Sequence, residues 1–180
     1  MPAVSASLDV ADVRRVLARL DVVDAVAALP ADALTAVGDG VNDVLVVDPP
    51  QAGAERFALK VGTFSTAANL RAGVAAARAL RAYTTLPVPD VLGFDAGDED
   101  RPPAVALTYC PGAPLASGFD DTENLADPAR VSLLGAVVAA LDALPADAAT
   151  GYGTIQRVDA NDDGPHLAAD FDHFDEWLVD

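Results

Sequence analysis

Arg56-Phe57-Ala58-Leu59-Lys60-Val61 is a short alternating segment, typical of a β-strand with one buried face. It carries the single lysine of the chain, since the other ten basic residues are arginines. Because side chains alternate along a strand, we expect Lys60 to share a face with Ala58 and the larger apolar residues to take the opposite face. Two interpretations of Lys60 remain open. It is either a strand residue with its amine in water, or a compact point charge that binds an anionic group such as phosphate.

The sequence around this segment predicts an antiparallel sheet. Gly38-Asp39-Gly40 is a turn signal between two short apolar stretches, and an acidic turn at 95–103 separates two more. Such spacing is typical of strands joined by hairpin connections. The five expected strands cover residues 34–37, 44–47, 57–61, 91–94 and 104–109.

Helices are expected before, within and after this sheet, where apolar residues recur at helical spacing. Asp9 is placed to cap the first helix, and Ser65 or Thr66 the second. Residues 110–115 contain two prolines, which remove strand donors, so we interpret them as a linker. The expected helices cover residues 8–29 (as one helix or two), 66–82, 126–144 and 167–178, with loops expected at 151–155 and 159–165.

The chain is strongly acidic, with 28 acidic residues against 11 basic ones and a net charge of -17. No basic stripe is present to neutralise phosphates along a nucleic acid, so the composition argues against a nucleic-acid partner. Dispersed aspartates with almost no lysine indicate adaptation to a salty cytoplasm, where self-repulsion is screened. We therefore expect a halophilic, acidic protein that is less stable in dilute buffer.

Other features of the sequence bear on where the protein works. One cysteine, Cys110, leaves no internal disulfide to form. No run of 18 uncharged apolar residues predicts a membrane span, and the first residues lack the pattern of a secretion signal. These observations predict a cytoplasmic protein with no membrane partner.

The order of elements, with a glycine loop before the lysine strand and a helix after it, resembles the N-terminal lobe of a known family. That family is the aminoglycoside phosphotransferase and choline kinase group of kinase-like small-molecule phosphotransferases. The resemblance covers roughly residues 33–180 and is carried by the order and spacing of several pieces together. These are Gly38-Asp39-Gly40-Val41-Asn42-Asp43-Val44, Phe57-Ala58-Leu59-Lys60, Leu86-Pro87-Val88-Pro89-Asp90-Val91-Leu92, Tyr109-Cys110-Pro111-Gly112-Ala113-Pro114-Leu115, Leu141-Asp142-Ala143-Leu144-Pro145 and Tyr152-Gly153-Thr154-Ile155.

The resemblance implies an α+β fold. A protein-kinase-like small lobe, with a five-stranded antiparallel sheet and a helix, would be followed by the first helices of an incomplete helical large lobe. The implied domains are an N-terminal helical segment at 1–32, a nucleotide-binding small lobe at 33–110, a hinge or linker at 111–118 and the start of the large lobe at 119–180.

The resemblance also implies roles for individual residues. Lys60 would contact the α- and β-phosphates of ATP or GTP, bound with Mg²⁺, and Ala58 would lie against the purine. The loop that holds Gly38, Gly40 and Asn42 would cover the phosphates through backbone N–H groups. A simple hairpin turn is an equal alternative for that loop, since Asp-Gly is a hairpin signal by itself. Tyr109 and Cys110 would form the hinge that binds the adenine edge.

Two departures from the family pattern matter. The family pairs its lysine with a glutamate on the following helix, whereas no acidic residue occurs here between Lys60 and Asp90, and the aligned position is near Gly73. The family's His-Gly-Asp catalytic loop and metal-binding aspartate are also not found in the 180 residues; His173-Phe174-Asp175 imitates them only by coincidence. We therefore assign no catalytic residue and no metal ligand, and we expect the chain to be inactive alone.

These observations leave two functional hypotheses. The first is an ATP-dependent phosphotransferase, represented by its nucleotide-binding half, whose acceptor would be a small hydroxylated molecule bound by a complete large lobe. The alternative is a non-catalytic module of the same fold that binds a nucleotide or a protein. The apolar residues at 131–144 and 171–178 further predict self-association or a partner protein, because a large bare apolar patch usually marks an interface.

Overall fold

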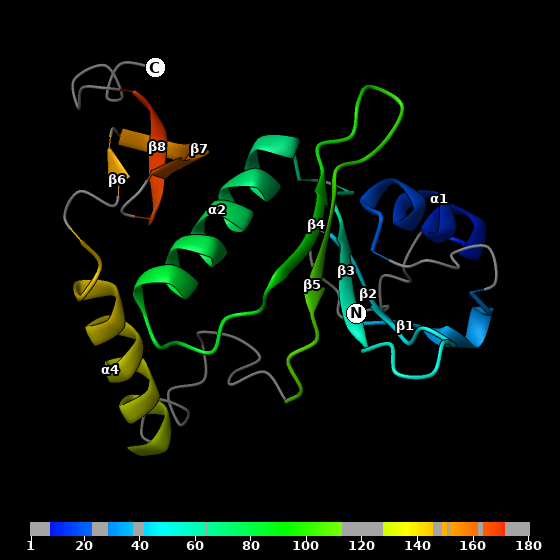
Figure 1. The fold of residues 1–180 in the computed structure, drawn as a ribbon, viewed down its shortest axis with the longest axis horizontal. Coiled ribbons are helices and arrows are strands. Elements are labelled where there is room, and N and C mark those ends of the chain that lie inside the picture. Colours follow the sequence, from blue (N-terminus) through cyan, green and yellow to red (C-terminus); the bar gives the residue numbers. More distant parts are fainter. Residues whose placement is uncertain are drawn as a thin grey trace, which may run out of the picture.

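The computed structural model describes residues 8–22, 29–37, 42–63, 65–112, 128–145, 149–150, 152–161 and 164–171. A five-stranded antiparallel sheet with the order β1-β2-β3-β5-β4 forms its centre, with helix α1 on one face and helix α2 on the other (Figure 1). The elements are α1 (Val10–Leu20), a 3-10 turn (Ala31–Ala33), β1 (Leu34–Ala36), β2 (Asp43–Val47), β3 (Phe57–Val61), α2 (Ala67–Tyr83), β4 (Val91–Asp95), β5 (Ala104–Thr108), α4 (Pro128–Asp142), β6 (Ala149–Thr150), β7 (Tyr152–Asn161) and β8 (Gly164–Phe171). The five predicted strands of the sheet and the α+β class are confirmed.

Helix α1 begins at its predicted cap but covers only the first part of the helical segment expected at 8–29: it ends at Leu20, and residues 23–28 lie outside the described residues. The Asp9 side chain accepts a hydrogen bond from the backbone N–H of Asp12 at 2.8 Å, and the Asp12 side chain accepts one from the backbone N–H of Asp9. This reciprocal pair is a capping box, which satisfies two otherwise unpaired backbone donors. Asp21 closes the helix in the left-handed conformation, with φ 54°.

The main core lies between α1 and the sheet. Four residues of α1 are buried, and they meet the buried face of β2, β3 and β5. Gly93 on β4 makes the close approach possible, because a Cβ there would lie 2.9 Å from the carbonyl oxygen of Leu20. An ion pair between Arg19 and Asp95, with Nε–Oδ2 at 2.6 Å, also joins the helix to β4. The core consists of Val13, Val16, Leu17, Leu20, Leu29, Ala33, Leu45, Val47, Phe57, Leu59, Val61, Ala104 and Ala106.

Helix α2 lies on the other face of the sheet. Thr66 caps it by accepting a hydrogen bond from the backbone N–H of Asn69 at 3.2 Å. Leu70 and Val74 are buried, and α2 contacts both β4 and β5. A second stripe of α2, Ala75 and Ala79, is also buried, and the helix contacts β7 and β8 as well. Helix α2 therefore joins the two sheets of the molecule, as Figure 1 shows.

The C-terminal region corrects one prediction. The expected helix at 167–178 is wrong for residues 167–171, which belong to strand β8; residues 172–178 lie outside the described residues. Strand β8 pairs antiparallel with β7 and parallel with β6, so the loops expected at 151–155 and 159–165 are mostly strand. The sequence contains the reason, since Asp163-Gly164 is a hairpin signal and the flanking residues also fit a period of two.

Helix α4 confirms the expectation of a helix within 126–144. Its apolar side chains are unusually exposed in the described part of the chain, with Leu134 and Val138 each 58% exposed. None of the described helices combines the length and apolar character needed to span a bilayer.

Candidate functional site

Two rows of side chains cross the central strands on the face that α2 covers. Lys60 on β3 pairs with Val44 on β2 and with Val105 on β5. Two residues along the strand, Ala58 pairs in the same way with Val46 and Leu107. Because residues paired directly across strands share a face, Lys60 and Ala58 lie on one apolar platform with their neighbours.

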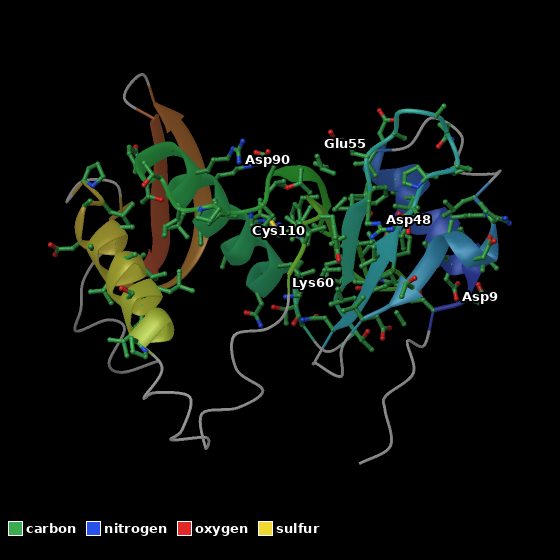
Figure 2. All side chains as sticks on the ribbon, turned by 90° about the horizontal axis from the view of Figure 1, so that it is seen from below. Asp9, Asp48, Glu55, Lys60, Asp90 and Cys110 are labelled. Carbon is green, nitrogen blue, oxygen red and sulfur yellow. The ribbon has the colours of Figure 1, made fainter. Side chains whose placement is uncertain are left out.

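The two faces of β3 differ sharply in burial. Phe57, Leu59 and Val61 are at most 3% exposed and pack under α1. Ala58 and Lys60 are half-buried. Figure 2 shows Lys60 on the side of the sheet that faces α2. The alternation predicted for this strand is confirmed, and it leaves the lysine on the less covered face.

The amine of Lys60 forms no ion pair or hydrogen bond within the described residues. Helix α2 contributes no carboxylate, because its charged residues are Arg71, Arg78 and Arg81. Arg81 is itself paired with Asp90, with Nε–Oδ1 at 2.5 Å. Open space surrounds the position where a Cβ of Gly73 would lie. An ammonium group with no partner among the described residues is available to an anionic ligand.

The glycine loop before β2 is only partly described. Gly38 and Gly40 lie outside the described residues, so their predicted role is not tested. Asn42 ends the loop half-buried, and its Oδ1 is enclosed without a hydrogen-bond partner among the described residues. Asp43 is buried and accepts a hydrogen bond from the Thr63 hydroxyl at 2.9 Å. Since Asp43 pairs with Val61, it lies on the α1 face and not beside Lys60.

The end of the platform farthest from Lys60 carries a polar cluster. The Arg56 guanidinium pairs with Asp48, with Nε–Oδ1 at 2.5 Å, and lies over the Tyr109 ring at 5.3 Å from its centroid. The hydrogen bond to Asp48, with its negative charge, raises the pKa of Arg56, so the guanidinium stays charged. Cys110 follows and is exposed (Figure 2). The structure thus places Tyr109 and Cys110 at the strand end where the sequence predicts a hinge.

Two hollows in the described part of the chain lie on the α1 side of the sheet. The first, of about 330 Å³, includes Arg56, Phe57 and Thr108 in its lining, so Arg56, at the end of the sheet, also borders this hollow. The second, of about 560 Å³, lies between α1 and the β4–β5 turn. Neither of these two hollows includes Lys60 in its lining.

The platform contains residues that were not singled out from the sequence. Val44, Val46 and Leu107 flank Ala58 and Lys60; Val44 and Leu107 are half-buried, whereas Val46 is buried. Alternation alone places Val44 and Val46 on one face of β2. Their pairing with β3 depends on how the 48–56 connection sets the register, and the pairing of Leu107 requires β5 to lie beside β3. Neither is fixed by a local pattern.

Comparison with known proteins gives one match. The model of the phosphotransferase enzyme family matches residues 33–178, from β1 through the C-terminal strands. Searches of curated proteins and of solved structures gave no match. Helix α1 therefore lies before the matched region, whereas every residue of the platform lies within it.

Proposed function

Because this chain belongs to the phosphotransferase enzyme family, we propose that the α2-facing side of its sheet binds the nucleoside triphosphate that donates the phosphoryl group. The observation that carries the proposal is the position of Lys60. It is the one lysine of the chain, and it extends from a half-buried site on an apolar platform with no partner among the described residues. An ammonium group in such a place gains most from a multiply charged anion.

The platform suits the rest of a nucleotide as well. Ala58 is small, and the half-buried Leu107 beside it offers an apolar surface for a flat base. The hinge at Tyr109 and Cys110 lies beyond it, where backbone groups would meet the edge of the base. The phosphates would lie at the Lys60 end, beside Asn42 and the glycine loop. ATP or GTP would fit this arrangement equally.

The proposed reaction is transfer of the γ-phosphoryl group to a hydroxyl of a small molecule. In such reactions Mg²⁺ neutralises charge that develops on the phosphates. Among the described residues no three His, Cys, Asp or Glu side chains come together as a metal site, so they do not fit a protein-held Mg²⁺. We therefore propose that this 180-residue chain positions the nucleotide but does not transfer the phosphoryl group by itself.

Calorimetric titration of ATP into the chain in molar KCl, with and without Mg²⁺, tests the proposal. Saturable binding is expected, and Lys60→Ala should weaken it roughly ten- to hundredfold, the cost of losing a charged contact. Arg78→Ala is the matched control, because it removes one positive charge from the exposed surface of α2. Equal losses in the two variants, or no binding by the unmodified chain, would contradict the proposal.

A second candidate is a non-catalytic module that binds a nucleotide or a protein. It is favoured by the absence of any carboxylate on α2, since the family's lysine normally has one to hold it in place. Neither candidate predicts ATP turnover by the 180-residue chain alone. Turnover with small hydroxylated acceptors that Lys60→Ala abolishes would exclude the module, and it would also contradict the proposal that the chain does not transfer the phosphoryl group by itself.

We further propose that α4 takes part in an interface. Five of its apolar side chains are between 47% and 58% exposed, which is uncommon for isolated soluble helices. Light scattering in high salt should then show self-association, or partner binding should cover α4. A sharp monomer peak that is unchanged by Leu134→Ser together with Val138→Ser would count against self-association. The exposed residues are Val131, Leu133, Leu134, Val138 and Leu141.

A further inference from the structure

We infer that Arg56 is a positioning residue for the base end of the nucleotide face, acting through its contact with the Tyr109 ring. This inference rests on the proposed nucleotide site. It adds a residue that positions the base, a role that the lysine, the glycine loop and the hinge do not fill. We call Asp48, Arg56 and Tyr109 the base-end cluster.

The base-end cluster extends the two rows of the platform. Along β3, Lys60 and Ala58 occupy alternate positions, and Arg56 is the next position in the same series. Phe57 pairs with Val47 and with Thr108, so Arg56 is adjacent to Asp48 on one side and Tyr109 on the other. Arg56 immediately precedes β3, and four residues of extended chain separate it from Lys60 by about 13 Å. An extended nucleotide bound with its phosphates at Lys60 would bring its base close to the cluster.

The contacts within the cluster define what Arg56 does. Asp48 accepts a hydrogen bond from the guanidinium Nε, with Nε–Oδ1 at 2.5 Å, which restrains the position of the group. The guanidinium carbon Cζ lies over the Tyr109 ring, 5.3 Å from its centroid, a cation–π arrangement. The ring is thereby held against β3 at the point where the chain leaves β5 for the hinge. The backbone of Tyr109 and Cys110 is then positioned for contact with a base.

The other side of the hinge is held independently. The backbone N–H of Thr108 donates to the Asp90 carbonyl at 2.9 Å, and the Thr108 hydroxyl accepts from the Asp90 backbone N–H at 2.9 Å. Asp90 is in turn paired with Arg81 of α2. Thr108 is therefore fixed from the α2 side, and Arg56 supplies the corresponding restraint on Tyr109.

A purely structural role for Arg56 is not favoured by its exposure. The Arg56 and Asp48 side chains are 51% and 43% exposed, and pairs this open contribute little to folding. The pair of Arg101 and Asp98 in the β4–β5 turn has almost the same exposure, 52% and 45%. Arg101 lies away from the platform, so it provides a matched control for loss of an exposed arginine in an ion pair.

The test compares ATP with inorganic tripolyphosphate, which carries the phosphates but no base. Arg56→Gln should weaken ATP binding roughly two- to fivefold, the effect of one exposed cation–π contact, and leave tripolyphosphate binding unchanged. Arg56→Lys should restore only part of the loss, because an ammonium keeps the cation–π attraction to the ring but lacks the Nε–H that binds Asp48. Arg101→Gln should change neither affinity, and Lys60→Ala should weaken both.

The outcomes separate the inference from the proposal on which it depends. If Arg56→Gln weakens both probes equally, Arg56 acts only as a charge and the positioning role is wrong. If ATP binds but no Arg56 variant changes its affinity, the inference fails while the proposed function stands. If the unmodified chain binds neither probe, both fail. Unfolding midpoints of all variants show whether any loss comes from folding.

Discussion

The two faces of the central sheet are built from the same strands, but strand β3 is far more deeply buried on one of them. On the α1 face, Leu59 and its neighbours are completely buried in the main core. On the α2 face, Ala58 and Lys60 are half-buried and form part of an open platform. One face holds the fold together, and the other is where we propose that the nucleotide binds. Strand alternation gives a single segment of five residues these two unlike faces.

The contrast also explains why α1 matters although it precedes the region matched to the phosphotransferase enzyme family. Helix α1 covers the α1 face with Val13, Val16, Leu17 and Leu20. Without this cover, Leu59 and the residues around it would be exposed to water. A stable core on one side lets the platform remain open on the other.

The largest expected effect is on the α1 face. Leu59→Ala removes a side chain that is 0% exposed, and the resulting cavity should lower the free energy of unfolding by about 2–5 kcal/mol. Leu107→Ala makes the same chemical change on the α2 face, where the side chain is half-buried, and should cost less. Denaturant unfolding in molar KCl measures both. Equal losses of unfolding free energy in the two variants would mean that the two faces contribute equally to stability, which would contradict the contrast.

Salt should change overall stability without changing this contrast. At a net charge of -17, moving from dilute buffer to molar KCl shortens the screening length to about 3 Å and should raise the thermal midpoint. The difference in unfolding free energy between Leu59→Ala and the unmodified chain should stay nearly constant, because it reports apolar burial. A thermal midpoint that does not respond to salt would contradict the halophilic interpretation.

A bulky side chain on the platform should affect binding and not folding. Ala58→Leu places extra volume where the base would lie, and ATP affinity should fall roughly tenfold through steric exclusion. The unfolding free energy should change little because position 58 is only half-buried. Calorimetry measures the ATP affinity, and denaturant unfolding of the same preparation measures the unfolding free energy. Unchanged ATP affinity would show that the base does not bind against Ala58.

The smallest effect is expected at the start of α1. The pKa of Asp9 lies below its usual value of 3.8, chiefly because its carboxylate accepts a hydrogen bond from the backbone N–H of Asp12. A lowered folded-state pKa gives stability that is present above the unfolded value and is lost as the pH falls through the folded value. Asp9→Asn caps a helix without titrating. Relative to this variant, the unmodified chain should lose stability below about pH 4, measured by unfolding across pH 2–7. Parallel pH profiles would contradict the capping role.

Much of the small lobe could be predicted from local sequence patterns. The alternation at 57–61, the turn signals and the Asp9 and Thr66 caps are short-range features, and the structure confirms them. The C-terminal helix was wrong over 167–171, because Leu167 and Phe171 suit a helical spacing while the hairpin with β7 favours a strand. Such pairing is decided by contacts distant in sequence, which a local period does not contain.

The candidate site also combines residues that local sequence patterns predict with contacts that depend on pairing distant in sequence. Lys60 and Ala58 were found from composition and alternation, and Tyr109 from the resemblance. The partnership of Arg56 with Asp48 and Tyr109 could not be found in this way, because it joins three segments through the register of the sheet. The predicted roles of Gly38 and Gly40 stay predictions, since both lie outside the described residues.

The most direct test of the central claim uses the single lysine of the chain. An ATP derivative with an acyl group on its terminal phosphate transfers that group to a nearby amine, forming an amide as the acyl–phosphate bond breaks and ATP leaves. Mass spectrometry should find the acyl group on Lys60, and excess unmodified ATP should prevent its transfer. Labelling of Lys60 that ATP does not reduce, or labelling confined to the N-terminal amine, would contradict a nucleotide site on the α2 face.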